Sequence, residues 1–207
     1  MVLALLLISS AAQSESPRRI LVMGDSLSAA FGLSAEQGWV SLLQEKVKDQ
    51  GWQVINASVS GETTAGGKTR IAAALSEHRP AIVVIELGAN DGLRGLPLEL
   101  ARQNLSAMIR QSQAAGSEVL LIGMQIPPNY GPDYTQQFID MYRDLALEHE
   151  VALLPFLLAP IAESRTAFLP DQLHPNAAAQ PALAEHVMSA LSKVIQQAGV
   201  PATENSP

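Results

Sequence analysis

The chain has 207 residues, of which 47% are hydrophobic, 16% charged and 4% aromatic, and its formal net charge at pH 7 is -7. This length can bury a full core, and the composition indicates a folded, aliphatic-rich chain and excludes a disordered one. The acidic balance and the lack of cysteine exclude a basic nucleic-acid surface, disulfides, thiolate catalysis and Cys-ligated zinc. We therefore expect neither nucleic acid nor an anionic membrane surface as a partner.

The chain begins with a short apolar run, VLALLLISSAA, which ends in small residues before a polar stretch. The run is too short to span a bilayer as a mature helix, and Ser10 and Ala12 are placed as in a cleavage site. Residues 1–12 are therefore predicted to be a secretory signal peptide, which implies a periplasmic or secreted protein without a stable membrane anchor. The usual basic residue of such a peptide is missing, and a buried first strand or helix is the alternative.

Five short apolar runs follow, and we interpret them as β-strands. Two of them, AIVVIEL and VLLIG, are nearly apolar throughout, which is typical of parallel strands covered on both faces. Amphipathic stretches separate the runs, and apolar residues spaced by three and four predict helices over 97–115 and around 183–194. The predicted strands are residues 20–23, 53–56, 81–87, 118–122 and 151–154.

The alternation of strands with helical stretches indicates a parallel sheet with right-handed crossovers. The predicted fold class is α/β, a three-layer α/β/α domain around a central five-stranded parallel sheet, over residues 19–199. Residues 200–207 are polar and contain proline, which predicts a flexible tail. Ligands of such sheets bind beyond the carboxyl ends of the strands, so the residues that follow each strand are candidates for the site.

A serine follows the first predicted strand, in the stretch GDSLS. A serine hydroxyl attacks a carbonyl carbon only when a base takes its proton and donors receive the developing negative charge. At a strand-to-helix turn, the backbone N–H of Ser26 would be one of the unpaired donors of the helix N-terminus. Ser26 is therefore a candidate nucleophile, or else only the cap of that helix. We expect Asp25 to interact with backbone donors and the helix dipole.

One of the four histidines is placed to act as the base. His78, His149 and His186 lie beside glutamates in polar helical segments, and we interpret them as solvated surface residues. His174 lies outside any periodic run, three positions after Asp171. In a turn, this spacing brings the carboxylate onto one ring nitrogen and leaves the other to face a serine; a chance surface pair is the alternative.

Gly61 and Asn90, which follow the second and third predicted strands, are candidate oxyanion donors. A glycine leaves its N–H open to a carbonyl oxygen, and an amide side chain can direct a further donor at the same oxygen. With the N–H of Ser26 they supply three donors. Either residue alone is also compatible with ordinary turn chemistry. The four segments together favour acyl transfer, because one sheet would bring them to the same edge.

The stretches GDSLS, SVSGETT, GAND and DQLHP resemble the four sequence blocks of the GDSL esterases and lipases, also called SGNH hydrolases. VIELGANDGLRGLP and QIPPNYGPDY are most similar to the bacterial periplasmic branch with acyl-CoA thioesterase I, lysophospholipase and arylesterase activities. The resemblance implies a flavodoxin-like fold, a triad of Ser26, His174 and Asp171, and an oxyanion hole of Ser26, Gly61 and Asn90. It further implies hydrolysis of carboxylic esters and thioesters through an acyl-enzyme, without metal or organic cofactor. We expect a monomer.

Two segments are candidates for the wall of an apolar acyl groove: the stretch from Gln125 to Tyr134, and PFLLAPIAES before the Asp-His turn. Plain surface loops are the alternative. The resemblance adds that the loop from Asp91 to Gly95 can cover the acyl chain, and we expect a pocket for short to medium chains and some longer ones. The predicted substrate-binding residues are Asp91, Gly92, Leu93, Ile126, Pro127 and Tyr130.

Other functions fit the sequence less well. A metal-dependent phosphoesterase built on Asp25, Asp91, Asp171 and His174 would have a single imidazole, where two-metal sites usually need more. The α/β-hydrolase fold shares the order Ser, Asp, His, but no Gly-x-Ser-x-Gly motif occurs. A carbohydrate O-acetylesterase on the same fold is the main alternative. A non-catalytic binding module is another, because fold does not fix function.

Overall fold

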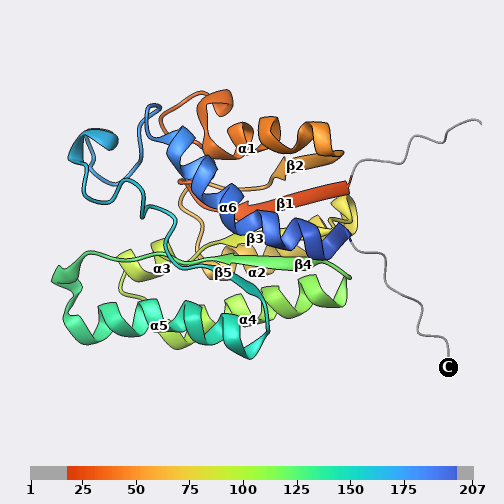
Figure 1. Cartoon of the computed structure of the whole chain (residues 1–207). Coiled ribbons are helices and arrows are strands. Elements are labelled where there is room, and N and C mark those ends of the chain that lie inside the picture. The colour runs from red at the N-terminus through yellow and green to blue at the C-terminus, as the bar shows by residue number, and fades with distance from the viewer. Residues whose placement is uncertain (1–17, 200–207) are drawn as a thin grey trace, which may run out of the picture.

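The structure is a computed structural model and describes residues 18–199, so the predicted signal peptide and tail lie outside the described residues. Its centre is a parallel sheet of five strands in the order β2-β1-β3-β4-β5 (Figure 1), which confirms the predicted sheet. Each strand lies within two residues of its predicted bounds. The strands are β1 (Arg18–Gly24), β2 (Trp52–Asn56), β3 (Ile82–Glu86), β4 (Glu118–Ile122) and β5 (Ala152–Leu154).

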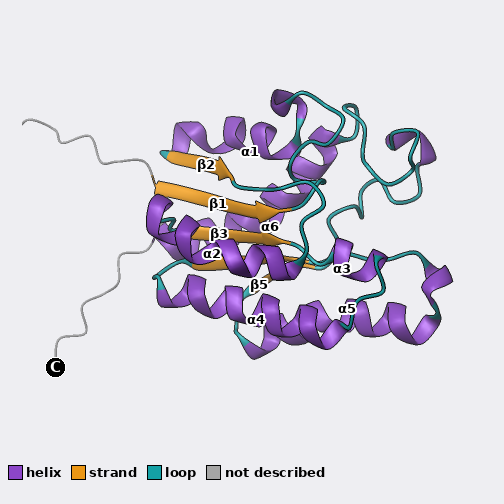
Figure 2. Cartoon of the chain, turned by 180° about the vertical axis from the view of Figure 1, so that it is seen from behind, coloured by secondary structure: helices purple, strands orange, loops and turns teal. Residues whose placement is uncertain are grey.

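Helices cover both faces of the sheet, which confirms the three-layer architecture. Helices α1 and α6 pack against each other on one face, and α2, α4 and α5 pack side by side on the other (Figures 1 and 2). The short helix α3 lies at the end where the loops gather. The helices are α1 (Trp39–Val47), α2 (Thr64–His78), α3 (Ala89–Leu93), α4 (Leu98–Ala114), α5 (Pro132–Glu148) and α6 (Gln180–Gly199).

The core follows from the apolar patterns of the sequence. Every residue of β3 is buried, and so are the last five residues of β1, because helices cover both of their faces. On α4 the buried residues include Leu105, Met108 and Ile109, on the face that the spacing of three and four predicts. One residue departs from this pattern: Glu86, the last residue of β3, is fully buried although it is an acid.

The strand order creates a switch point between β1 and β3. From β1 the chain crosses to β2 on one side, and from β3 it crosses to β4 on the other. The loops after β1 and β3 therefore diverge and leave a crevice between them, which is where ligands bind in such sheets. Ser26 follows β1 and Asn90 follows β3 at this point.

Some local predictions near this crevice are wrong. Ser26 does not begin a helix: a series of turns follows β1, and the first α-helix starts at Trp39. Ala30 and Gly32 have φ angles of 58° and 75°, a left-handed conformation that a right-handed helix cannot include. The loop expected after β3 begins as helix α3, and the segment 125–134 contains a 3-10 turn (Pro128–Tyr130) and the start of α5.

Candidate active site

Ser26, His174 and Asp171 form a continuous hydrogen-bonded chain at the carboxyl end of the sheet. His174 Nε2 lies 2.9 Å from Ser26 Oγ, and His174 Nδ1 lies 2.8 Å from Asp171 Oδ2. A carboxylate only accepts, so Nδ1 carries the proton in the neutral ring and Nε2 is left to accept the hydroxyl proton of Ser26. The structure thus brings together a hydroxyl, a base and an acid that orients the base, as nucleophilic catalysis requires.

The turn that carries Asp171 and His174 is closed by an antiparallel bridge between Phe168 and Pro175. Asp171 Oδ1 accepts the backbone N–H groups of Leu173 and His174, at 2.9 and 3.0 Å. The N–H of His174, then that of Leu173, and then the imidazole lower the pKa of Asp171 to about 2. The carboxylate is therefore ionised at neutral pH, and the 37% exposure of its side chain also favours the charged form.

The ring of Phe31 lies against the imidazole of His174. The ring centroids are 4.3 Å apart and the planes are tilted by 34°. This contact covers one face of the imidazole, and an aromatic face attracts a cationic ring. Phe31 is 47% exposed, which is high for a large apolar side chain, and no sequence motif indicated its position beside the base.

Two backbone N–H groups at the site, those of Ser26 and Gly61, have no backbone or side-chain acceptor among residues 18–199. Both residues line the same cleft as His174, so both donors are available to an oxygen bound there. Gly61 has a φ of 79°, a left-handed conformation that glycine adopts without strain. The backbone of this loop therefore favours glycine at this position.

The side-chain amide of Asn90 is held on two sides. Its Nδ2 donates to Asp25 Oδ2 and to the carbonyl oxygen of Glu62, at 3.0 Å in each case. An amide nitrogen has two N–H groups, so Asn90 must share or exchange one of these bonds in order to donate to an oxyanion. Through these bonds Asn90 joins the stretch that carries Ser26 to the loop that carries Gly61.

Two buried carboxyl groups lie behind the nucleophile. Asp25 is 1% exposed and Glu86 is 0% exposed. Glu86 Oε2 accepts from Ser28 Oγ at 2.6 Å and from the backbone N–H of Asp25 at 3.3 Å, whereas Oε1 has no partner among the described residues. A Cβ at Gly24 would lie 2.6 Å from Ser28 Oγ and 2.8 Å from Glu86 Oε2, so only glycine fits in front of this contact.

Burial sets the charge state of this pair. It raises the pKa of Asp25 to about 6, against the lowering effect of the N–H of Leu27, which donates to Asp25 Oδ1 at 3.0 Å. Burial, and then the charge of Asp25, raise the pKa of Glu86 well above its usual range. At neutral pH the pair therefore favours an ionised Asp25 beside a protonated Glu86.

The bond from Leu27 confirms that Asp25 binds a backbone donor, but no helix dipole acts there.

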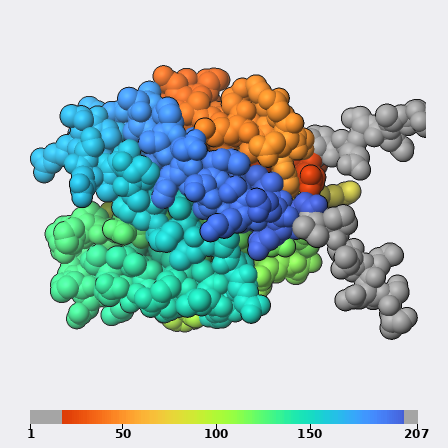
Figure 3. Space-filling model, in the orientation of Figure 1, coloured from red at the N-terminus to blue at the C-terminus, as the bar shows by residue number. Residues whose placement is uncertain are grey.

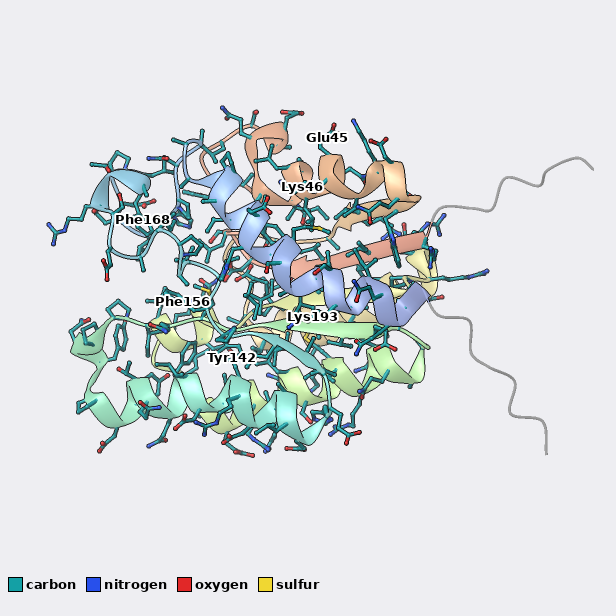
Figure 4. The ribbon with its side chains drawn as sticks, viewed as in Figure 1. Glu45, Lys46, Tyr142, Phe156, Phe168 and Lys193 are labelled. Carbon is teal, nitrogen blue, oxygen red and sulfur yellow. The ribbon has the colours of Figure 1, made fainter. Side chains whose placement is uncertain are left out.

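A cleft of about 660 Å³ opens at the triad, within the usual size range of ligand pockets. Besides Ser26, Gly61, Asn90 and His174, its wall is mainly apolar. Figure 4 labels two of its aromatic residues, Phe156 and Phe168, on loops beyond the sheet. In the space-filling view, the light-blue loop residues and the green residues before α5 lie at the same end of the molecule (Figure 3).

The structure divides the predicted substrate-binding residues into two groups. Leu93, Ile126 and Pro127 line the cleft, and the other three do not. The lining also includes Met124 and Phe156, which the sequence did not single out, although PFLLAPIAES was a candidate wall segment. The residues outside the lining are Asp91, Gly92 and Tyr130.

In the structure these three residues contact other residues of the protein, and their contact with substrate stays a prediction. Asp91 is 3% exposed and accepts the N–H and hydroxyl of Thr64, at 2.9 and 2.7 Å, so it caps the first turn of α2. Tyr130 Oη donates to the carbonyl oxygen of Leu93 at 2.7 Å. Gly92 packs so tightly that a Cβ there would lie 2.8 Å from a methyl carbon of Ile126.

The other histidines do not reach the cleft, but their interpretation as solvated residues is wrong. His149 Nε2 lies 2.8 Å from Ser106 Oγ, and the His149 side chain is 9% exposed. His186 Nε2 donates to the carbonyl oxygen of Phe156 at 3.0 Å. The His78 side chain is 24% exposed.

The acids of the alternative metal site do not converge. Asp91 is bound to Thr64 at the start of α2, and Asp171 is bound to His174. Within the part of the chain that the structure describes, no group of three or more His, Asp or Glu side chains is placed to hold a metal ion.

The fold, with a hydrogen-bonded Ser-His-Asp chain at its switch point, has the features of a serine hydrolase. A sequence model of the GDSL-like Lipase/Acylhydrolase family matches residues 22–181. The chain belongs to this family, which confirms the resemblance found in the sequence.

Relatives of known name extend this result. Esterase TesA of Pseudomonas aeruginosa is 46% identical over 195 residues, 93% of this chain and 96% of that protein. Thioesterase 1/protease 1/lysophospholipase L1 of Escherichia coli (strain K12) is 38% identical over 180 residues, 85% of this chain and 84% of that protein. The crystal structure of the psychrotrophic esterase EstA from Pseudoalteromonas sp., inhibited by monoethylphosphonate, has 41% identity and a TM-score of 0.83, and covers 86% of this chain and 99% of that chain.

Proposed function

We propose that this chain is a serine esterase that hydrolyses carboxylic esters and thioesters through an acyl-enzyme on Ser26. The observation that carries the proposal is the chain of hydrogen bonds from Ser26 through His174 to Asp171 at the wall of an apolar cleft. The names of the relatives, an esterase and a thioesterase/lysophospholipase, support the same class of substrates.

In the first half of the reaction, His174 Nε2 takes the proton of Ser26 Oγ as the oxygen attacks the carbonyl carbon. The imidazole becomes cationic, and the ionised Asp171 at Nδ1 stabilises that cation and fixes the ring. His174 then gives the proton to the leaving alcohol or thiol. The acyl group remains on Ser26 as an ester.

The developing oxyanion is received by the N–H groups of Ser26 and Gly61 and by the amide of Asn90. The two N–H groups have no acceptor within residues 18–199, so they need not break a bond to serve this role. Asn90 has to redirect one N–H from Asp25 or from Glu62. Loss of one donor of this kind typically costs roughly a hundredfold to a thousandfold in turnover.

In the second half, water attacks the acyl-enzyme with His174 again as the base, and the carboxylic acid leaves. The phosphonate that inhibits the Pseudoalteromonas esterase is a tetrahedral anion of the kind that this site would stabilise. The apolar wall of the cleft favours an acyl chain over a sugar ring, so a fatty ester is better supported than an acetylated carbohydrate.

Hydrolysis of p-nitrophenyl butyrate by Ser26→Ala tests the proposal. We expect the rate to fall to background with an unchanged melting temperature, whereas Ser192→Ala, a half-buried serine of α6 far from the site in sequence, should retain the wild-type rate. An active Ser26→Ala enzyme would contradict the mechanism. A chain-length series in which only acetate is released would instead favour the carbohydrate O-acetylesterase.

We also infer a periplasmic or secreted monomer. The apolar run at residues 1–12 supports export, and among residues 18–199 no helix has the length and apolar character needed to cross a membrane. N-terminal sequencing of the protein from a bacterial periplasmic extract should give a start after residue 12. Light scattering should give the mass of one chain.

A further inference from the structure

We propose that Arg94 recognises a phosphate group in the leaving group of the substrate. The favoured substrates are then single-chain esters in which a phosphate lies one glycerol unit from the ester, as in lysophospholipids. This inference rests on the proposed function, because it assigns a specificity to the same site.

Arg94 follows α3 and is exposed, directly after Leu93, which lines the cleft. Its Nη2 donates to the carbonyl oxygen of Gly61 at 3.0 Å, and this is the one hydrogen bond that the guanidinium makes among the described residues. Gly61 itself lines the cleft. A guanidinium has five N–H donors in a planar fork that suits phosphate oxygens, so Arg94 can hold the Gly61 loop and a phosphate together.

Positive charge is scarce at this end of the sheet. The segments that follow the five strands contain two arginines, Arg94 and Arg165, and no lysine; these segments are residues 25–38, 57–63, 87–97, 123–131 and 155–179. Of these, Arg94 alone forms a side-chain hydrogen bond to a residue of the cleft wall. Of the arginines and lysines in these segments, Arg94 is therefore the one that contacts the cleft wall and can bind an anionic group there.

The exposed apolar residues of these segments fit an amphiphilic substrate. Seven large hydrophobic side chains are exposed among residues 18–199, and five of them lie in the same segments. Two of them, Phe31 and Leu173, line the cleft and can contact an acyl chain that reaches from the cleft to the surface. These five residues are Phe31, Val59, Leu96, Tyr130 and Leu173.

The distance between the ester and the phosphate differs between two phosphate-bearing leaving groups. In a lysophospholipid, the phosphate follows the ester after one glycerol unit. In an acyl-CoA, the whole pantetheine arm separates the thioester from the first phosphate. Arg94 is held against Gly61, next to the proposed oxyanion hole, and therefore fits the shorter leaving group.

A matched pair of substrates tests this inference: 1-lauroyl-lysophosphatidylglycerol and 1-lauroyl-glycerol, both below their micelle concentrations. They contain the same ester and acyl chain and differ in the phosphate-bearing head group. The quantity measured is the ratio of kcat/KM for the two. We expect Arg94→Ala and Arg94→Gln to lower this ratio about threefold to tenfold, the range of a partly exposed, charge-assisted contact. Arg94→Lys should keep part of the ratio.

The control is Arg165→Ala, which removes the same charge from the other arginine and should leave the ratio unchanged. Added salt should lower the ratio of the wild type but not that of Arg94→Ala. Equal losses on both substrates would show that Arg94 only holds the Gly61 loop, and that result, or an unchanged ratio, would overturn the inference. A wild-type protein that hydrolyses neither these substrates nor p-nitrophenyl butyrate would contradict the proposed function instead.

Discussion

The two halves of the candidate site are held in place in opposite ways. Ser26 and Asn90 rest on buried groups, with Asp25 1% exposed and Glu86 0% exposed behind them. His174 and Asp171 lie on a surface turn whose carboxylate is fixed by backbone N–H groups. Burial raises the pKa of Asp25, whereas those N–H donors lower the pKa of Asp171. We therefore expect substitutions on the nucleophile side (Ser26, Asn90, Asp25 and Glu86) to change activity and stability together. Substitutions on the base side (His174 and Asp171) should change activity alone.

The largest expected effect is on the base side. Asp171→Asn keeps the shape of the turn but removes the acceptor that fixes the proton on Nδ1 of His174. Loss of such a partner lowers kcat by up to about ten-thousandfold. The melting temperature should change little, because the side chain is partly exposed. Paired rate and melting measurements check this, and a large loss of stability with intact activity would reverse the comparison.

On the buried side, Asp25→Asn should change activity and stability together. The new amide keeps an acceptor for Leu27 but presents N–H groups to Asn90, so the clamp on Asn90 is lost. We expect a fall in kcat of roughly a hundredfold, as for loss of an oxyanion donor. Steady-state kinetics on p-nitrophenyl butyrate measures it, and Asp49→Asn on the surface is the control. A near-normal kcat would show that Asn90 does not need Asp25.

The same carboxyl group predicts a pH dependence of stability. The pKa of Asp25 is raised from 3.8 to about 6, so the folded state binds the proton more tightly than the unfolded state. Its contribution is therefore fully present below about pH 4 and is lost as the pH rises through 6, on the order of 2–3 kcal/mol in the free energy of unfolding. Urea unfolding of wild type and Asp25→Asn between pH 4 and 7 checks this. The difference in the free energy of unfolding between the two proteins should change between pH 4 and 7. A constant difference would contradict the raised pKa of Asp25.

Glu86 offers a second test of the buried side. Glu86→Ala leaves a cavity and an unpaired hydroxyl on Ser28, which should lower the free energy of unfolding by about 2–4 kcal/mol. Glu86→Gln matches the shape of the protonated acid, so its free energy of unfolding should stay within about 1 kcal/mol of the wild-type value at pH 7. Chemical unfolding measures both. Equal damage from the two substitutions would mean that Glu86 is ionised.

The smallest effect is expected at Phe31. Phe31→Leu removes the ring that lies on His174 while keeping an apolar side chain. An exposed contact of this kind is worth about 0.5–1 kcal/mol, so kcat/KM should fall about twofold to fivefold. Leu147→Ala, an exposed residue of α5, serves as the control. A loss of kcat/KM as large as that of Asp171→Asn would show that Phe31 is needed to position His174.

Much of the fold and the triad geometry could be predicted from the sequence because both depend on local signals. Apolar runs mark the strands, and three positions in one turn join Asp171 to His174. Glu86 and Arg94 were missed because their roles come from contacts between distant segments: Glu86 meets Ser28 across 58 positions, and Arg94 meets Gly61 across 33. The contact of Asp91 with Thr64 was missed for the same reason, because it joins residues 27 positions apart.

The most direct test of the mechanism is the site of covalent labelling by a fluorophosphonate, read by intact mass and peptide sequencing. The proposed acyl-enzyme predicts one adduct per chain, on Ser26, that is lost in Ser26→Ala and formed far more slowly in His174→Ala. Rapid labelling of a serine other than Ser26, or no labelling of an enzyme that hydrolyses esters, would contradict it.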